Sequence, residues 1–477
     1  MDESKATIPL EEPLPIQTEP SYEKTSDSET DDDPQKGTCV CSFSLWTCCG
    51  APIWVRRWIT VALVVVVVLI VIFLIAASAS TKQYQATVPS VGQAQNSASS
   101  LNNNENIVIV GAGAAGLFAG YTLKYLGIDS FQILEAGDDF GGRVRQLDSE
   151  DFVDVPLDLG AEWIHVQPSI LEQLLLPFEN QTWTELPKTI RYQPQTIGVS
   201  TDGESVSSRD WFRWFYAETK FYDSTWWSYL ADYVVNPYLH DKIQLNTAVE
   251  YIDYTNVNNG DKIRLVTTEG EEILADRVIM AVPVKILQDE VITFVPPVPQ
   301  SKRGAWDSVY VAEGLKVWLE FAEDFYPDLL IPGTIFGTYV NEDRIYFDAL
   351  FGKDDLTNRH VLALFEVGPT AGAKVTMSDD EIVQTILKEL DAMYQGKPSQ
   401  YLLQSKVQNW SKEPFIQGAY SYNWQEYRNQ FGALREPIDK RLYFCGEYLA
   451  DESATVHGAA ISGRNVVRQL LDDLGDP

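Results

Sequence analysis

Three glycines, Gly111, Gly113 and Gly116, stand between two apolar stretches and could hold the pyrophosphate of a nucleotide. In this spacing the first glycine permits a tight turn after a strand, the second lets the backbone approach the phosphates, and the third lets a helix pack closely on the sheet. Glu135 follows 24 residues after Gly111, where a ribose hydroxyl needs an acceptor. The pattern predicts a dinucleotide-binding βαβ unit over residues 107–135, with the helix N-terminus facing the phosphates.

Further short motifs follow this unit along the chain. They are Gly141-Gly142-Arg143, Gly160-Ala161-Glu162-Trp163, Val282-Pro283, Trp410 with Glu413-Pro414, Gly418-Ala-Tyr-Ser421, Gly446-Glu447 and Thr455-Val-His-Gly-Ala459. In this order, over residues 105–475, they resemble the flavin-containing amine oxidase family, and within it most closely the polyamine oxidases.

The resemblance implies FAD as the cofactor. It assigns cofactor contacts to Gly111, Gly113, Gly116, Glu135, Arg143, Ala161, Glu162, Trp163, Val249, Trp410, Glu447, Thr455 and Val456. Arg143 would support the pyrophosphate, or alternatively form a surface ion pair. Val249 would offer backbone contacts to adenine, or alternatively belong to the core. Glu447 would contact the ribityl or phosphate region, or alternatively cap a helix. Ala419 stands where monoamine oxidases carry a flavin-linked cysteine, so the FAD is expected to be noncovalent.

The catalytic residues that the resemblance implies are Lys316, His165 and Tyr420. Lys316 would hold a water against flavin N5, or be an edge-strand lysine that reaches solvent. His165 would lie near the substrate amine and accept its proton, whereas His457 would order a loop. Tyr420 would form one wall of an aromatic cage for the amine, or pack in the core, an alternative that also holds for Trp410.

The reaction implied is oxidation of an amine by hydride transfer to flavin N5, followed by imine hydrolysis and reduction of O2 to hydrogen peroxide. The substrate implied is spermine, spermidine or an acetylated derivative, because Thr455 replaces the second cage tyrosine of monoamine oxidases. Glu162, Glu172 and the acids between Glu179 and Glu218 are candidate partners for distal ammonium groups. A monoamine or L-amino-acid oxidase and a noncatalytic flavin-binding membrane protein are the alternatives.

Charge supports a small cationic substrate and argues against nucleic acid as a partner. The formal net charge is −32; the first 55 residues carry −8, and Arg56 and Arg57 carry +2, which leaves −26 on residues 58–477. A negative field of this size would attract cationic amines, or would simply keep the domain soluble. The oligomeric state is not predicted by the sequence.

A run of nineteen uncharged, mostly apolar residues from Ile59 to Ala77 predicts one membrane-spanning helix. Arg56 and Arg57 precede it, so the positive-inside rule places the N-terminus in the cytoplasm and the catalytic part in a lumen or outside the cell. Four cysteines cluster before the predicted span: Cys39, Cys41, Cys48 and Cys49. They are expected to be palmitoylated, and the alternatives are that they are unmodified or that they bind a metal. Of two glycosylation sequons, Asn180 is the one expected to be exposed, and Asn409 the one that is not.

The elements that must position these residues form an α/β fold. Strands are expected within residues 243–282, a tryptophan-rich helical region over 208–235, and an amphipathic helix over 378–394. The predicted organisation is a disordered acidic tail (1–55), a transmembrane helix (56–78), a linker (79–104), a discontinuous Rossmann-like FAD-binding domain (105–165, 243–300 and 405–477), and a mixed-sheet and helical substrate domain (166–242 and 301–404).

Overall fold

The computed structural model describes residues 105–147, 150, 152–179, 185–214, 216–333, 343–422 and 424–475. The predicted tail, transmembrane helix, linker, cysteine cluster and the Asn180 sequon lie outside these residues. Among the helices that are described, none is both long enough and apolar enough to cross a bilayer. The proposed span therefore stays a prediction.

A five-stranded parallel sheet carries the βαβ unit that the glycines predict. Its strand order is β20 (Leu442–Phe444), β13 (Arg277–Met280), β1 (Ile107–Val110), β2 (Phe131–Leu134) and β9 (Ile243–Gln244). All residues of β1 are buried, which is typical of a central parallel strand covered on both faces. The mixed α/β fold expected from the sequence is confirmed, with a Rossmann-like arrangement around β1.

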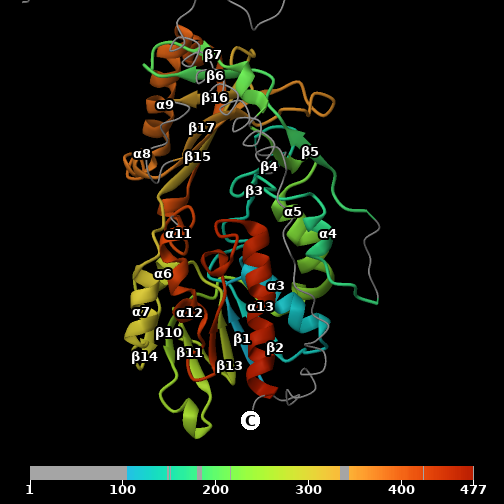
Figure 1. The fold of residues 1–477 in the computed structure, drawn as a ribbon, viewed down its shortest axis with the longest axis vertical. Helices are drawn as coiled ribbons and strands as arrows, with labels where there is room; N and C mark the ends of the chain where they lie inside the picture. Colours follow the sequence, from blue (N-terminus) through green and yellow to red (C-terminus); the bar gives the residue numbers. More distant parts are fainter. Residues whose placement is uncertain are drawn as a thin grey trace, which may run out of the picture. The chain divides into compact units, whose positions relative to one another are not determined.

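Two helices from opposite ends of the described chain pack against each other beside this sheet. They are α3 (Ala114–Tyr125), which follows β1, and α13 (Val456–Gly475), which follows β20 (Figure 1). Their close approach depends on Gly463, because a Cβ atom there would lie 2.1 Å from the carbonyl oxygen of Ala115. The C-terminal segment thus completes the fold around the first helix.

A four-stranded sheet extends the cofactor side. Its order is β12 (Glu272–Ala275), β11 (Ile263–Thr267), β10 (Val249–Asp253) and β14 (Thr293–Val295). The strands expected within residues 243–282 are therefore present and divided between two sheets: β9 and β13 join the parallel sheet, and β10 to β12 form this one.

A seven-stranded mixed sheet provides the opposite wall of the site. Its order is β19 (Leu402–Asn409), β15 (Gly314–Phe321), β18 (His360–Val367), β17 (Asp343–Asp348), β16 (Leu329–Pro332), β6 (Ile197–Ser200) and β7 (Ser207–Ser208). Helix α9 (Asp379–Tyr394) covers one face with Ile382, Ile386 and Leu390 (Figure 1). The predicted helix over 378–394 is confirmed, and Ser378 with Glu381 forms a capping box at its start.

The helical prediction over residues 208–235 is only partly right. Residues Glu218–Phe221 form strand β8, which pairs antiparallel with β5 (Thr189–Tyr192). Helical structure flanks this strand as a 3-10 turn over Asp210–Trp214, helix α5 (Trp226–Leu230) and a π-helix over Ala231–Leu239. A pairing partner far away in sequence decides the conformation of β8, and local periodicity does not report such a partner.

The remaining elements are short. They are β3 (Gln146–Leu147), β4 (Leu157–Asp158), α4 (Ile170–Gln173), His240–Lys242, Val257–Asn259, α6 (Val284–Gln288), α7 (Gln300–Asp307), α8 (Pro369–Gly372), α10 (Lys397–Tyr401), Trp410–Lys412, α11 (Trp424–Tyr427), Arg428–Gln430, α12 (Phe431–Arg435) and Glu447–Leu449.

Two helical glycines give a matched test of the packing between α3 and α13. We expect Gly463→Ala to destabilise the protein by about 1–3 kcal/mol or more, because the new methyl group overlaps backbone atoms of α3. Gly304→Ala in α7 meets no heavy atom within 4 Å and should stabilise by up to about 1 kcal/mol. Denaturant unfolding measures the free energy of unfolding of both variants. Equal values for the two variants would show that α3 and α13 do not pack as closely as the structure indicates.

Candidate active site

One cavity of about 760 Å³ gathers residues from all three large sheets and from the start of α13. It is lined by every residue that the sequence assigned to cofactor binding or catalysis except Gly116. Gly116 serves packing instead: a Cβ atom there would lie 1.9 Å from the carbonyl oxygen of Gly111, so only glycine allows α3 to start so close to the turn. The structure therefore brings the predicted site residues together.

The first turn of α3 suits a pyrophosphate. Gly113 and Ala114 line the cavity, no side chain caps the helix start, and no acid lies in the first turn. Unpaired backbone N–H groups at a helix N-terminus attract phosphate oxygens. Gly111 has a φ of +106°, and a Cβ atom there would lie 2.9 Å from the carbonyl oxygen of Ala281, so the tight turn requires glycine.

Glu135, at the end of β2, is held in place by backbone groups. Its two carboxylate oxygens accept hydrogen bonds from the N–H groups of Ala112 at 2.7 Å and Gly137 at 2.8 Å. Burial raises the pKa of Glu135, and these hydrogen bonds oppose the rise. A carboxylate has about four acceptor positions, so Glu135 keeps capacity for ribose hydroxyls.

Arg143 and Glu447 join the loop after β2 to the segment before α13. Arg143 Nη1 donates to Glu447 Oε1 at 3.0 Å and to the carbonyl oxygen of Ala419 at 2.9 Å. Glu447 also accepts from the backbone N–H groups of Ser421 and Ala454. The ion pair is therefore not a surface pair, since Glu447 is buried and both residues line the cavity.

Lys316 lies on β15, between β18 and β19, so the alternative of an edge-strand lysine is wrong. Its side chain is buried, and Nζ donates to Glu162 Oε2 at 2.9 Å, to the carbonyl oxygen of Asp158 at 3.0 Å and to that of Gly160 at 3.2 Å. A buried ammonium needs such partners. Glu162 is thereby engaged inside the protein, which makes it a poor partner for a distal substrate ammonium.

His165 faces a carboxylate at the wall of the cavity. Its Nδ1 lies 3.2 Å from Glu218 Oε2, and both residues line the cavity. Among the acids considered as substrate partners, Glu218 is therefore in place, whereas Glu172 is an exposed residue of α4 that does not line the cavity.

His457 is buried at the start of α13, with Nε2 2.6 Å from Glu452 Oε2. Burial, reinforced by the nearby His165, lowers its pKa to about 4, so it is neutral at pH 7. These contacts agree with a role in ordering the loop.

Tyr420 contributes an aromatic wall that the sequence predicted and a carboxylate contact that it did not. The hydroxyl groups of Tyr420 and Tyr422 both donate to Asp343 Oδ2, at 3.3 and 3.2 Å. The ring of Phe365 is stacked with Tyr420, their centroids 6.5 Å apart. Asp343 and Phe365 also line the cavity; neither belongs to a recognisable motif, so sequence reasoning missed both.

The other assigned residues complete the wall. Val249 is buried at the start of β10, and Trp410 is buried against Gly160, whose Cβ, if present, would lie 3.0 Å from the indole. Thr455 Oγ1 donates to the carbonyl oxygen of Glu452 at 2.7 Å. Ala161, Trp163 and Val456 line the same cavity.

Cys445 is the free cysteine of the described residues and is fully buried beside the cavity-lining Gly446. Burial raises the pKa of its thiol far above the usual range.

Asn409, the second glycosylation sequon, is buried as well. Its Nδ2 donates to the carbonyl oxygen of Val375 at 3.1 Å, so this sequon is not an exposed acceptor in the folded protein.

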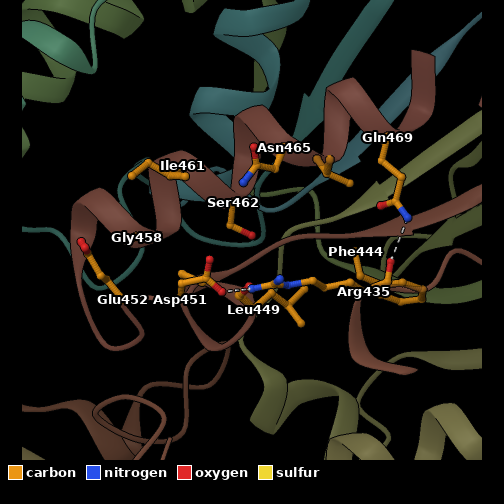
Figure 2. Close-up of a pocket in the computed structure, with 12 residues that line it drawn as sticks. Arg435, Phe444, Leu449, Asp451, Glu452, Gly458, Ile461, Ser462, Asn465 and Gln469 are labelled. Carbon is orange, nitrogen blue, oxygen red and sulfur yellow. Dashed lines mark hydrogen bonds and ion pairs between the residues drawn. The ribbon is translucent and has the colours of Figure 1, made fainter. Parts of the chain in front are cut away.

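A second, smaller cavity of about 390 Å³ lies between α13 and the segment that precedes it (Figure 2). Its main cation, Arg435, is already bound to Asp451 at 2.8 Å and to the carbonyl oxygen of Leu449, while Gln469 donates to the carbonyl oxygen of Arg435 at 3.3 Å. These contacts are structural, and none of the predicted site residues lines this cavity.

Comparison with solved structures supports the fold. Wild-type putrescine oxidase bound to putrescine superposes with a TM-score of 0.59 over 77% of this chain and 99% of that chain, at 16% identity. A triple mutant of putrescine oxidase gives 0.61 over the same shares.

Sequence relatives cover the chain to different extents. Lysine-specific histone demethylase 2 of Homo sapiens is 28% identical over 230 residues, which are 46% of this chain and 27% of that protein, so the match spans only about a quarter of the demethylase. Polyamine oxidase 1 of Zea mays is 22% identical over 487 residues, covering 81% of this chain and 94% of that protein.

Family models agree with the geometry of the cavity. A model of an NAD(P)-binding Rossmann-like domain matches residues 109–175, which contain the glycine turn and Glu135. The model described as flavin containing amine oxidoreductase matches residues 198–471, more than half of the chain. The uncapped start of α3, the anchored Glu135 and the Arg143–Glu447 pair offer suitable groups for the phosphates and sugar hydroxyls of FAD. The chain belongs to the flavin containing amine oxidoreductase family.

Proposed function

We propose that the protein is an FAD-dependent oxidase of a polyamine such as spermine, spermidine or an acetylated derivative. The observation that carries the proposal is the convergence of Lys316, His165 and Tyr420 on one cavity with the carboxylates of Glu218 and Asp343. Noncovalently bound FAD would accept a hydride equivalent from the carbon beside the amine and pass the electrons to O2, giving hydrogen peroxide. The resulting imine would be hydrolysed by water.

His165 would take the proton of the incoming ammonium. When its Nδ1–H donates to Glu218, the other ring nitrogen is an acceptor, which a substrate ammonium can approach. An amine must be neutral to yield its hydride, so this proton transfer prepares the substrate.

Aromatic faces and carboxylates would bind the rest of a polycation. Tyr420 and Phe365 offer stacked rings, and Asp343 and Glu218 offer negative charge within the same cavity. The formal charge of −26 on residues 58–477 would raise the encounter rate with such substrates. The names of the relatives, polyamine oxidase and putrescine oxidase, point to the same class of amine.

We further propose a single-pass membrane protein with a cytoplasmic N-terminus and a lumenal or extracellular catalytic domain. Support comes from the apolar run Ile59 to Ala77 and from Arg56 and Arg57 before it.

The substrate proposal is tested by mixing the full chain, loaded with FAD in detergent, with amines under anaerobic conditions. Spermine or spermidine should bleach the oxidised flavin absorbance rapidly, and air should restore it with release of peroxide. Benzylamine and an L-amino acid serve as matched comparisons. Bleaching by one of these and not by the polyamines would overturn the proposed substrate class.

Glu135→Gln should weaken FAD binding by about tenfold or more, because the charged acceptor near the ribose is lost. Flavin fluorescence during titration of the apoprotein with FAD gives the Kd. Glu269→Gln, at an exposed turn residue, should leave the Kd unchanged. An unaltered Kd for the Glu135 variant would remove this residue from the cofactor site.

Topology is tested through the Asn180 sequon. In a eukaryotic expression host the chain should carry one glycan, and glycosidase treatment should increase its mobility on a gel by the mass of that glycan. Asn180→Gln should abolish the shift. A fully expressed chain that lacks a glycan while a lumenal reporter is glycosylated would contradict the proposed orientation.

A further inference from the structure

A cluster of buried charges lies behind the predicted catalytic lysine. Glu162 lies between two lysines: its Oε2 is 2.9 Å from Lys316 Nζ, and its Oε1 is 3.8 Å from Lys220 Nζ. The three side chains are 8%, 4% and 2% exposed, so water screens their interaction little. Lys316 and Glu162 line the cavity, whereas Lys220, on β8, lies outside its lining.

The hydrogen bonds of Lys316 identify its protonation state. An ammonium has three N–H donors, and three oxygen acceptors lie within 3.2 Å of Nζ: Glu162 Oε2 and the carbonyl oxygens of Asp158 and Gly160. A neutral amine could serve only two of them. One of the three would have to be released for Lys316 to hold a water, and the Glu162 bond is the only one of the three that is charge-assisted on both sides.

Lys220 is itself fixed. Its Nζ donates to the carbonyl oxygen of Ala349 at 2.8 Å and lies 5.3 Å from the ring centroid of Tyr192. The Lys220 ammonium therefore cannot leave Glu162 without breaking its contacts with Ala349, in the turn after β17, and with Tyr192, on β5.

We propose that Glu162 is a positioning residue, which fixes Lys316 as an ammonium ion at the wall of the flavin cavity and is itself held by the buried ammonium of Lys220. Its effect on the reaction rests on the proposed oxidase function, whereas its effect on the charge of Lys316 does not. Glu162 belongs to the loop with the Gly-Ala-Glu-Trp segment. Through its two lysine contacts it joins this loop to two strands, β15 and β8.

Other charged groups face the cluster and act on it. They are Asp158 on β4, Asp348 on β17, and Asp223 and Lys353 in connecting segments. Burial lowers the pKa of Lys220 to about 8, with Glu162 opposing the fall, and burial raises the pKa of Asp158 well above its usual range. Asp158 is thus a weak substitute for Glu162, which leaves Glu162 as the principal counterion of both lysines.

The first test is the pH dependence of unfolding of the FAD-loaded full chain carrying Glu162→Gln. A lysine whose pKa is lowered by folding binds fewer protons in the folded state than in the unfolded state, where its pKa is about 10.4, so stability rises with pH across the interval between the two values. Folding lowers the pKa of Lys220 to about 8 and Glu162 opposes this fall, so loss of the Glu162 carboxylate should lower the folded pKa of Lys220 further and widen that interval downward. We expect Tm to fall by about 5 °C or more at pH 6 and by clearly less at pH 9.5.

Glu204→Gln, an exposed glutamate, is the matched control and should leave Tm unchanged at both pH values. A loss of Tm for the Glu162 variant that is equal at pH 6 and pH 9.5 would show that Glu162 acts through packing alone and would overturn the proposal.

The second test separates flavin reduction from reoxidation in rapid-mixing experiments between pH 6 and 10. In Glu162→Gln the pH profile of the half-reaction that depends on Lys316 should change, because Lys316 loses the opposite charge beside it. In a Lys316→Met background the same substitution should change the profile no further. An unchanged profile in the single Glu162 variant would overturn the proposal. If the wild-type protein oxidises none of the amines, the oxidase function fails and the unfolding test still decides the role of Glu162.

Discussion

The architecture around the cavity depends on one constraint, that a charge removed from water must find a partner of opposite sign. The cavity walls come from segments that lie far apart in the chain, and two ion pairs with buried carboxylates join them. Arg143 with Glu447 ties the loop after β2 to the segment before α13, and Lys316 with Glu162 ties the seven-stranded sheet to the loop after β4. Each pair is stable only when both partners are in place, so the segments that carry them must fold together.

Close backbone contacts also support the cofactor side of the cavity. Gly116 and Gly463 let α3 approach the turn after β1 and let α13 approach α3, so the phosphate-facing amides are carried by a helix that is packed on both sides. Because these backbone groups are already held rigidly, little conformational entropy of the protein is lost when a ligand binds to them. The start of α3, on the cofactor side of the cavity, is therefore held in place by close backbone contacts.

The distance along the chain over which each feature is determined explains how much the sequence could reveal. The glycine turn, Glu135 and the helix over 378–394 could be predicted because short-range spacing determines them. Family motifs supplied Lys316, His165 and Tyr420, whose neighbours in the chain would not have distinguished them. Asp343 and Lys220 could not be predicted, because strands β17 and β8 acquire their partners only through long-range pairing, and that pairing also changed part of the expected helical region into a strand.

Cys445 is the neighbour in sequence of Gly446, which lines the cavity in which hydrogen peroxide would be formed. Oxidation by peroxide requires a thiolate that is accessible to solvent, and Cys445 is neither accessible nor readily deprotonated. Met280 and Met393 are likewise buried. These three side chains are therefore protected from the peroxide that an oxidase makes. Met377 is only partly buried, so among the described residues it is the sulfur-containing side chain most open to oxidation.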